Sequence, residues 1–367
     1  MRLANVVGTR PQLIKAAALQ PALRDRHDEV FIDTGQHWDD GMAGVFFEEL
    51  ELRRPDRSLG IGGGTSAEQT GRMLVALEGA MREAAPDAVV VYGDTNSTLA
   101  AALVAAKMEL PIAHVEAGLR SFDRRMPEEV NRVVTDHLAR WSFAPTDAAM
   151  ANLAAEGLRE GVHLVGDVMR DLAARTLEDI RDEAVLSGIA AAVGVPLRTG
   201  EFLFATVHRA ENRAPDAIRG WVGVLEAIAR ADRPVVLALH PGTRKAVDAL
   251  GIRLDPNVIA IEPLGYRSSL AAQLHAAAVV TDSGGVQREA AWLGTPCLVL
   301  RGTTEWLETL RGDAASSVLV GLDATAARDA LDRLGPPEHA AEEANRRARE
   351  RRIEPDGATE AIARLLA

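Results

Sequence analysis

The stretch AVVVYGDTNSTLAAALVAAKME, residues 88–109, decides the fold class. Its first five residues, 88–92, are apolar and mostly β-branched, which predicts a buried strand. A glycine follows at Gly93, and residues 96–109 have the alanine-rich composition of a closely packed helix. A strand, a tight turn and a helix in direct succession form part of a βαβ unit, so this stretch favours a parallel α/β sheet.

The same succession of strand and helix repeats in both directions from this stretch. Two series of such units are separated by an Ala-, Leu- and Glu-rich segment near 167–193. We therefore expect two doubly wound, Rossmann-like α/β domains that face one another across a cleft, with helices on both faces of each sheet. The expected boundaries are 1–168 for the first domain, with a final helix at 356–367 returning to it, and 169–355 for the second. The remaining strands are expected at 3–7, 30–33, 111–115, 141–144, 202–206, 235–239, 258–261, 278–281, 297–300 and 318–320.

The composition excludes several classes of protein. The chain has 367 residues and a formal charge of −12, which argues against a broad nucleic-acid surface because such a surface is basic. Its single cysteine, Cys297, excludes a disulfide framework and a cysteine-rich metal site. We see neither a signal peptide nor an apolar run long enough to span a membrane, so we expect a cytoplasmic protein with no membrane partner.

Acidic side chains follow two neighbouring strands of the first domain. Asp94 comes after the strand at 88–92, Glu116 comes after the strand at 111–115, and Glu128 opens the next helix. Each has an ordinary alternative, since Asp94 could cap a helix and acids are common in a first helical turn. Three carboxylates converging on one sheet edge would raise one another's proton affinity, which suits proton transfer.

Basic and glycine-rich segments follow other strands. A turn with Arg10 precedes the first helix, where a guanidinium and free N–H groups suit a phosphate, although an ordinary surface arginine fits equally well. In the second domain, basic or phosphate-binding residues follow three strands, with an acid one turn further that could reach a ribose diol. These residues are His208, Arg209, His240, Ser283, Gly284, Gly285 and Glu289. Dinucleotide and P-loop motifs are absent, so no cofactor is expected. No spacing of His, Asp and Glu residues demands a metal, so no metal is expected either.

Ten motifs, in order along nearly the whole chain, resemble those of the non-hydrolysing UDP-N-acetylglucosamine 2-epimerase family. They are GTRPQLIK (8–15), TGQH (34–37), YGDTNSTLA (92–100), HVEAGLRSF (114–122), MPEEVNRVVTDH (126–137), APT (144–146), VGD (165–167), HRAEN (208–212), TDSGGVQREA (281–290) and LGTPC (293–297).

The resemblance implies a GT-B-like fold, a UDP-sugar substrate, a homodimer and inversion of carbon 2 of the sugar. UDP is eliminated to give a 2-acetamidoglycal and then re-adds, while a proton reaches the opposite face of C2. By motif, Asp94, Glu116 and Glu128 would serve the proton transfers, and His208 and Arg209 would support the diphosphate. Phosphates would be held by Arg10 and Ser283 to Gly285, the ribose by Glu289, and Lys15 matches a further binding position.

Four alternatives stay open. Trp306 and Leu307 replace an Arg-Pro pair that the family often has, and the segment around Arg124 and Arg125 is more similar to the branch acting on UDP-2,3-diacetamido-2,3-dideoxyglucuronate. Those two arginines could meet a substrate carboxylate or could be solvated loop charges. A hydrolysing epimerase, a GT-B glycosyltransferase or an inactive nucleotide-sugar binder would share the fold.

Overall fold

We describe the protein from a computed structural model that covers residues 1–367 except 37–46, 48, 311–315 and 354–355. His37 of the TGQH motif and the expected domain boundary at residue 355 lie outside the described residues. The chain divides into two compact units, which we describe separately. Unit 1 comprises Met1–Leu172 with Glu354–Ala367, and unit 2 comprises Ala173–Ile353.

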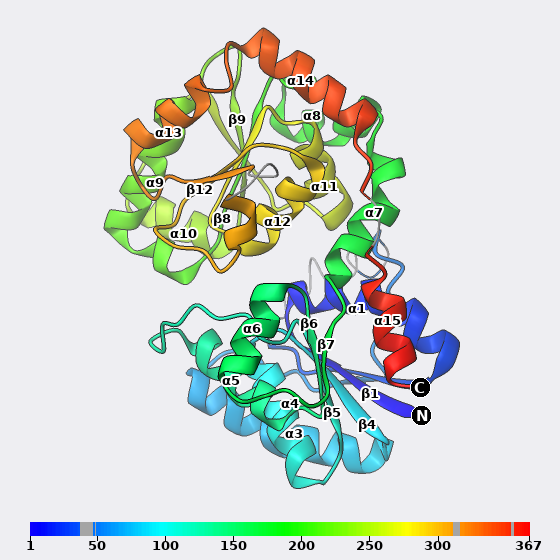
Figure 1. Cartoon of the computed structure of the whole chain (residues 1–367). Coiled ribbons are helices and arrows are strands. Elements are labelled where there is room, and N and C mark those ends of the chain that lie inside the picture. The colour runs from blue at the N-terminus through cyan, green and yellow to red at the C-terminus, as the bar shows by residue number, and fades with distance from the viewer. Residues whose placement is uncertain (37–46, 48, 311–315, 354–355) are drawn as a thin grey trace. The chain divides into compact units, whose positions relative to one another are not determined.

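Unit 1 is built on a sheet in which all paired strands are parallel, in the order β3-β2-β1-β4-β5-β6-β7 (Figure 1). Its strands are β1 (Arg2–Val7), β2 (Asp28–Asp33), β3 (Arg57–Ser58), β4 (Ala88–Tyr92), β5 (Ile112–Val115), β6 (Trp141–Ala144) and β7 (Val162–Leu164). Its helices are α1 (Arg10–Arg26), α3 (Ser66–Ala84), α4 (Asn96–Lys107), α5 (Pro127–Leu138), α6 (Asp147–Ala155) and α15 (Ala358–Leu365), while α7 (Val168–Ile180) continues into unit 2.

The core of unit 1 explains its layers. Along β1 and β4, buried side chains point alternately to the two sides of the sheet. Those on one side pack against Met73 and Leu77 of α3. Four of the five alanines of α4 are buried, as the composition of this helix predicts, and they let α3 and α4 lie close together.

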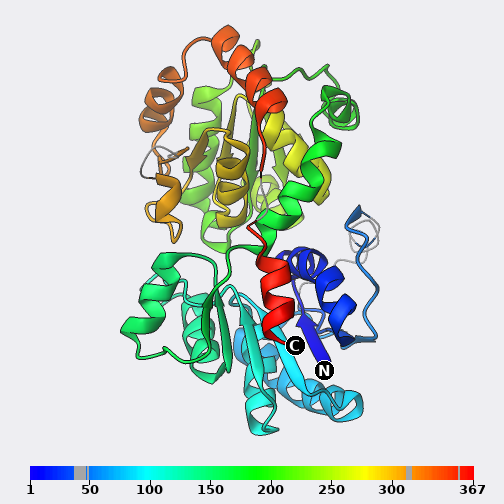
Figure 2. The same ribbon diagram turned by 45° about the vertical axis from the view of Figure 1, so that its right-hand side comes forward.

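On another part of unit 1, the C-terminal helix α15 lies against α1, and the two termini of the chain lie beside each other (Figure 2). Arg26 forms an ion pair of 3.2 Å with Glu360. The imidazole Nε2 of His27 lies 3.0 Å from the carbonyl oxygen of Ala363.

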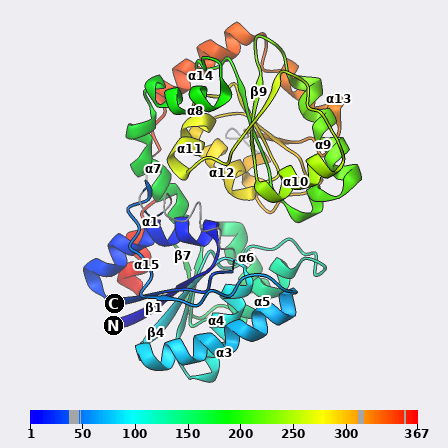
Figure 3. The same ribbon diagram turned by 180° about the vertical axis from the view of Figure 1, so that it is seen from behind.

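Unit 2 repeats this architecture with the parallel strand order β10-β9-β8-β11-β12-β13. Its core has a layer of α9 and α13, which lie side by side in Figure 3, and buried side chains from both helices pack on the sheet. The strands are β8 (Leu203–Val207), β9 (Val235–Leu239), β10 (Val258–Ile261), β11 (Ala278–Thr281), β12 (Cys297–Val299) and β13 (Ser317–Leu319). The helices are η1 (Glu183–Leu186), α8 (Ser187–Val193), η2 (Ala210–Arg213), α9 (Pro215–Ile228), α10 (Pro241–Ala249), α11 (Tyr266–His275), α12 (Gly284–Leu293), η3 (Leu307–Leu310), α13 (Ala324–Asp332) and α14 (Pro337–Glu350).

The expected α/β fold with two parallel, helix-covered sheets is confirmed. The sequence did not indicate β3 or β7. Both are short, and β7 carries half-buried or exposed side chains, so neither has the apolar run that marks a central strand.

Candidate active site

The turn after β4 places Asp94 at the carboxyl end of the unit 1 sheet. Gly93 has φ of +62°, a left-handed conformation that glycine adopts without strain. The interpretation of Asp94 as a helix cap is wrong, because Thr95 is the N-cap of α4 and its hydroxyl accepts from the amide of Thr98. The carboxylate of Asp94 is therefore available for other contacts, and its side chain is 34% exposed.

Glu116 follows β5 at the same edge of the sheet and is buried. Its backbone has φ of +70°, which is unusual for a residue with a side chain. The Oε2 atom lies 2.7 Å from the ammonium Nζ of Lys15, and Oε1 lies 3.2 Å from Nη2 of Arg132. A Cβ on Gly93 would stand 3.4 Å from both Oε1 of Glu116 and Nζ of Lys15, so the glycine also leaves room for this ion pair.

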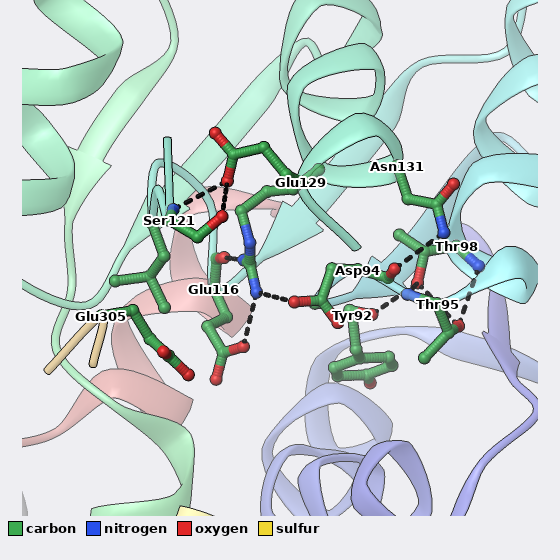
Figure 4. A network of polar contacts seen from close by, with 12 residues as sticks. Tyr92, Asp94, Thr95, Thr98, Glu116, Ser121, Glu129, Asn131 and Glu305 are labelled. Carbon is green, nitrogen blue, oxygen red and sulfur yellow. Dashed lines mark hydrogen bonds and ion pairs between the residues drawn. The ribbon is translucent and has the colours of Figure 1, made fainter. Parts of the chain in front are cut away.

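Arg132, on α5, joins the two carboxylates (Figure 4). Its Nη2 donates to Oδ2 of Asp94 at 2.6 Å and to Oε1 of Glu116 at 3.2 Å, and its Nη1 donates to the Glu116 carbonyl. Burial opposes the charged guanidinium, but the charges of Asp94 and Glu116 raise the pKa of Arg132 above its ordinary value. We call Lys15, Asp94, Glu116 and Arg132 the carboxylate cluster.

Glu128 lies apart from the carboxylate cluster. It is exposed in the first turn of α5, and its side chain has no hydrogen bond or ion pair with the part of the chain that the structure describes. Its neighbour Glu129 is buried instead and accepts hydrogen bonds from the amide and hydroxyl of Ser121, at 2.7 and 2.9 Å, and from the amide of Phe122. Of the three predicted carboxylates, unit 1 thus brings Asp94 and Glu116 together.

The first βα turn of unit 1 places Arg10 as the first residue of α1, half-buried. The turn itself is tightly packed, since a Cβ on Gly8 would stand 2.1 Å from the hydroxyls of Ser97 and Thr34. Gln12, in the first turn of α1, donates from Nε2 to the carbonyl of Tyr92 and to the Thr98 hydroxyl, each at 2.8 Å. This bond connects the start of α1 to the turn that carries Asp94.

In unit 2, the buried carboxylate of Asp282 fixes the turn that carries His208 and Arg209. It accepts from the amide of His208 at 3.2 Å and from the amide of Arg209 at 3.0 Å. Asn212 donates from Nδ2 to the same carboxylate at 2.7 Å. His208 Nδ1 lies 3.6 Å from Oδ1 of Asp282, and the imidazole is 45% exposed. Asp282 therefore anchors the backbone of the turn that carries His208 and Arg209.

The Ser283–Gly285 turn opens α12. The Ser283 hydroxyl accepts from the amide of Val286 at 3.4 Å and is the N-cap of the helix. A Cβ on Gly284 would stand 2.8 Å from Oε1 of Glu305 and from Nε1 of Trp306, whereas a Cβ on Gly285 would meet only Ser283 Oγ at 3.7 Å. A helix N-terminus with two glycines and a hydroxyl favours an anion.

Trp306, which stands where the family often has arginine, is buried and lies under the guanidinium of Arg288, 3.7 Å from the ring centroid. Glu305 beside it lies 2.9 Å from Nη1 of Arg301 and 3.6 Å from Nη2 of Arg209. Burial would raise the pKa of Glu305, but Arg301 and Arg209 hold it below its ordinary value. The Ser283–Gly285 turn is therefore bordered by an ionised carboxylate and two arginines.

Two predicted binding residues have structural partners in unit 2. Glu289 is buried on α12 and accepts from Nε2 of Gln273 at 2.7 Å. His240 is the N-cap of α10, and its Nδ1 accepts from the amide of Gly242 at 3.2 Å. In the described ranges there is no group of three or more His, Cys, Asp or Glu side chains arranged to hold a metal ion. No helix within these ranges is both long and apolar enough to cross a membrane.

Comparison with known proteins shows which protein family has this arrangement of residues. The sequence model described as UDP-N-acetylglucosamine 2-epimerase matches residues 21–366. The chain belongs to this family. The UDP-N-acetylglucosamine 2-epimerase of Methanocaldococcus jannaschii is 40% identical over 329 residues, 88% of each chain. The UDP-2,3-diacetamido-2,3-dideoxy-D-glucuronate 2-epimerase of Pseudomonas aeruginosa is 42% identical over 337 residues, 90% of each chain.

Solved structures agree with the family. The crystal structure of the M. jannaschii UDP-GlcNAc 2-epimerase with UDP-GlcNAc and UDP has a TM-score of 0.86 and 36% identity, and covers 100% of this chain and 99% of that one. A calicheamicin glycosyltransferase has a TM-score of 0.54 at 17% identity, which shows a likeness of fold alone. The predicted family and the GT-B-like fold are confirmed, and the enzymes of this family are epimerases, a kind of isomerase.

Several residues of these sites were not singled out from the sequence, although most lie in the quoted motifs. They are Gln12, His114, Arg132, Asp136, Asp282, Arg301 and Glu305. For the site residues on α5, the sequence did contain a pattern that could have identified them. Glu129, Arg132 and Asp136 recur at spacings of three and four, so one face of this helix is polar and yet buried. A buried polar face needs partners, and for Arg132 these partners are the carboxylates at the strand ends.

Proposed function

We propose that the protein is a non-hydrolysing UDP-GlcNAc 2-epimerase that interconverts UDP-GlcNAc and UDP-ManNAc. The observation that carries the proposal is the ion-paired arrangement of Asp94 and Glu116 on either side of Arg132, at 2.6 and 3.2 Å. Two carboxylates held at a sheet edge suit proton removal and delivery at one carbon. Membership of the epimerase family and the relative with bound UDP-GlcNAc and UDP support the same substrate.

The proposed reaction balances in two steps. In the first, a base takes the proton from C2 while the bond between C1 and the UDP oxygen breaks, which forms the C1–C2 double bond of a 2-acetamidoglycal and releases bound UDP. In the second, UDP re-adds at C1 while a proton is delivered to the opposite face of C2. Asp94 and Glu116 are the proposed proton-transfer groups, with Glu128 retained as a third candidate.

The anion-binding residues have proposed roles in holding UDP throughout. We assign the diphosphate to Arg10, Lys15, Arg209 and the Ser283–Gly285 turn, with His208 assisting departure of the leaving group. We assign the ribose to Glu289 and a second basic contact to His240. A guanidinium such as that of Arg209 keeps its charge at every relevant pH, and hydrogen bonds to charged groups are among the strong ones. UDP held this way remains available for re-addition.

The organisation of the chain follows from the same proposal. We propose residues 1–168 with 356–367 as the domain that carries the proton-transfer carboxylates, and 169–355 as the UDP-binding domain. A UDP-sugar substrate, a homodimer, a cytoplasmic location and the absence of nucleic-acid or membrane partners complete the proposal. Size-exclusion chromatography with light scattering tests the dimer, for which a mass of two chains is expected.

Proton NMR in D₂O tests the reaction. The purified protein is incubated with UDP-GlcNAc, and in parallel with UDP-2,3-diacetamido-2,3-dideoxyglucuronate. The expected result is UDP-ManNAc with deuterium at C2 and no steady accumulation of free UDP. Accumulation of UDP with free N-acetylmannosamine would instead identify a hydrolysing enzyme. Deuterium in the diacetamido uronate alone would identify the specialised branch.

One observation favours that branch as the second candidate. In the loop before α5, Arg125 is paired with Asp123 at 2.7 Å, and this hydrogen bond lowers the pKa of Asp123 to about 2. Arg124 in the same loop is exposed and has no ion pair with the residues that the structure describes. It would suit a uronate carboxylate. Arg124→Ala should then weaken binding of the uronate and leave UDP-GlcNAc unaffected.

A further inference from the structure

A second layer of charge lies beneath the carboxylate cluster, in unit 1. His114, on β5, and Asp136, on α5, are both fully buried. The imidazole Nδ1 of His114 lies 2.6 Å from Oδ1 of Asp136, and its Nε2 lies 2.7 Å from the carbonyl oxygen of Gly93. Neither residue is among those to which we assign contact with the substrate.

The partners of His114 fix its protons. A carbonyl oxygen can only accept, so Nε2 donates to Gly93. Burial would raise the pKa of Asp136, but the charges of His114 and Arg120 lower it below its ordinary value, so its carboxylate is ionised and also accepts. Each ring nitrogen of His114 is therefore held by one oxygen, from Asp136 on one side and from Gly93 on the other.

The pair holds the backbone on both sides of the carboxylate cluster. The carbonyl that His114 binds belongs to Gly93, the residue before Asp94. The second oxygen of Asp136 accepts from the amide of Gly118, two residues after Glu116, at 3.1 Å, and lies 2.7 Å from Nη1 of Arg120. One buried pair thus reaches both strand-end turns that carry the proposed proton-transfer groups.

The turn after β5 has a backbone conformation that needs such support. Glu116 has φ of +70°, which is unfavourable for a residue with a side chain unless its neighbours are fixed. Arg132 sits four residues before Asp136 on α5 and binds both carboxylates directly. One helix therefore supplies a direct contact through Arg132 and an indirect one through Asp136.

We propose that His114 and Asp136 are a positioning pair that sets the relative placement of Asp94 and Glu116. This inference rests on the proposed function, because it assumes that these carboxylates transfer protons. A misplacement of about 1 Å can lower a rate by about 10²-fold, so a single lost bond to one turn is measurable in kcat.

Two substitutions of His114 test the two hydrogen bonds of its imidazole separately. In His114→Gln the amide nitrogen is three bonds from Cβ, as Nε2 is, so the variant keeps a donor for Gly93 and loses the contact with Asp136. In His114→Asn the amide nitrogen is two bonds from Cβ, as Nδ1 is, so the variant keeps Asp136 and loses Gly93. His163→Asn is the matched control, since His163 on β7 is half-buried and stacks on Phe143.

We expect kcat for UDP-GlcNAc epimerisation to fall about 10²-fold in His114→Asn and at most about tenfold in His114→Gln, with KM nearly unchanged in both. The control should keep the wild-type kcat. A merely structural role predicts a different result, in which both variants lose folded protein equally and the kcat of the folded fraction stays normal. That outcome, or a normal kcat in His114→Asn, overturns the proposal.

Hydrogen–deuterium exchange tests the pair without relying on activity. Peptides covering 93–97 should exchange faster in His114→Asn than in the wild type, the Gln variant or the control. If the wild-type protein turns over neither UDP-sugar, the proposed function fails while this measurement still decides the positioning pair. Unchanged exchange at 93–97 in folded His114→Asn would show that the hydrogen bond from His114 to Gly93 does not stabilise this turn.

Discussion

Replacing Asp356 by Asn should stabilise the protein, and more so at alkaline pH. Asp356 stands where the chain returns to unit 1 before α15. Its Oδ2 accepts from the amide of Asp167 at 3.1 Å and lies 3.7 Å from Nη1 of Arg170. Burial and the neighbouring carboxylate of Asp171 raise the pKa of Asp356 to about 6, although the Asp167 amide opposes the shift.

The magnitude follows from the difference between the folded and unfolded pKa. Below the unfolded value of 3.8 the carboxyl is protonated in both states, and its protonated form contributes its full stability. That contribution is lost as the pH rises through about 6, because the folded chain must then hold an unfavourable charge. A shift from 3.8 to about 6 corresponds to about 3 kcal/mol.

Solvent reduces this figure. The side chain of Asp356 is 25% exposed, and the residue as a whole, including its backbone, is exposed. We therefore expect about 1.5 kcal/mol at pH 8, since water screens a partly exposed charge. An asparagine keeps an oxygen for the Asp167 amide and offers an N–H to Asp171, so the existing contacts survive.

Thermal denaturation at pH 8 and pH 5 measures the effect. Asp356→Asn should raise the apparent Tm at pH 8 by about 3–6 °C, given about 2–4 °C per kcal/mol for a unit of this size. At pH 5 the gain should fall to about half, because the wild-type carboxyl is by then largely protonated when folded. Asp25→Asn, exposed on α1, is the control and should have no such pH dependence. A lower Tm at pH 8, or the same gain at both pH values, would refute the reasoning.

Three further predictions concern the proposed catalytic and binding residues. Glu116→Gln should keep its affinity for UDP in calorimetry but lose about 10²–10⁴-fold in kcat, and near-normal turnover would remove Glu116 from the mechanism. Arg10→Ala should weaken UDP-GlcNAc binding by about tenfold or more, so intact binding with a reduced rate would contradict its phosphate role. Gly284→Ala should weaken UDP binding far more than Gly285→Ala, because its Cβ would stand 2.8 Å from Glu305 and Trp306; equal effects would argue against this steric reason.

The sequence could locate strand-end residues because parallel strands end at one edge of a sheet. This is why Asp94 and Glu116, on neighbouring strands, were expected together and are found on one guanidinium. The sequence singled out Glu128, whereas the buried carboxylate at the start of α5 is that of Glu129. Both stand in the first turn of α5, and the rotation of the helix about its axis decides which one is buried.

The sequence could not indicate which partner each buried charge takes. Asp282 lies in the TDSGGVQREA motif beside the predicted phosphate-binding residues, yet its carboxylate accepts from the amides that follow β8, 74 and 73 residues earlier in the chain. Trp306 was noted only as a departure from the family's Arg-Pro pair, and it packs under Arg288 in the unit 2 interior. Such pairings depend on side-chain packing across strands, which spacing along the chain does not encode.

The buried charges of the two units are paired in different ways, and this difference supports different roles for the two units. In unit 1 each carboxylate of the cluster has a cationic partner within 3.2 Å, so Asp94 and Glu116 are held in place and their charges are balanced. In unit 2 the buried charge of Asp282 is satisfied largely by backbone amides and Asn212, so the turn is rigid while the Arg209 side chain reaches only a loose contact of 3.6 Å with Glu305. A balanced cluster suits proton transfer, because its groups need not reorganise. A rigid turn that presents an incompletely neutralised arginine suits an anion that must bind, leave the sugar and return, because the protein can hold the diphosphate in each of these states.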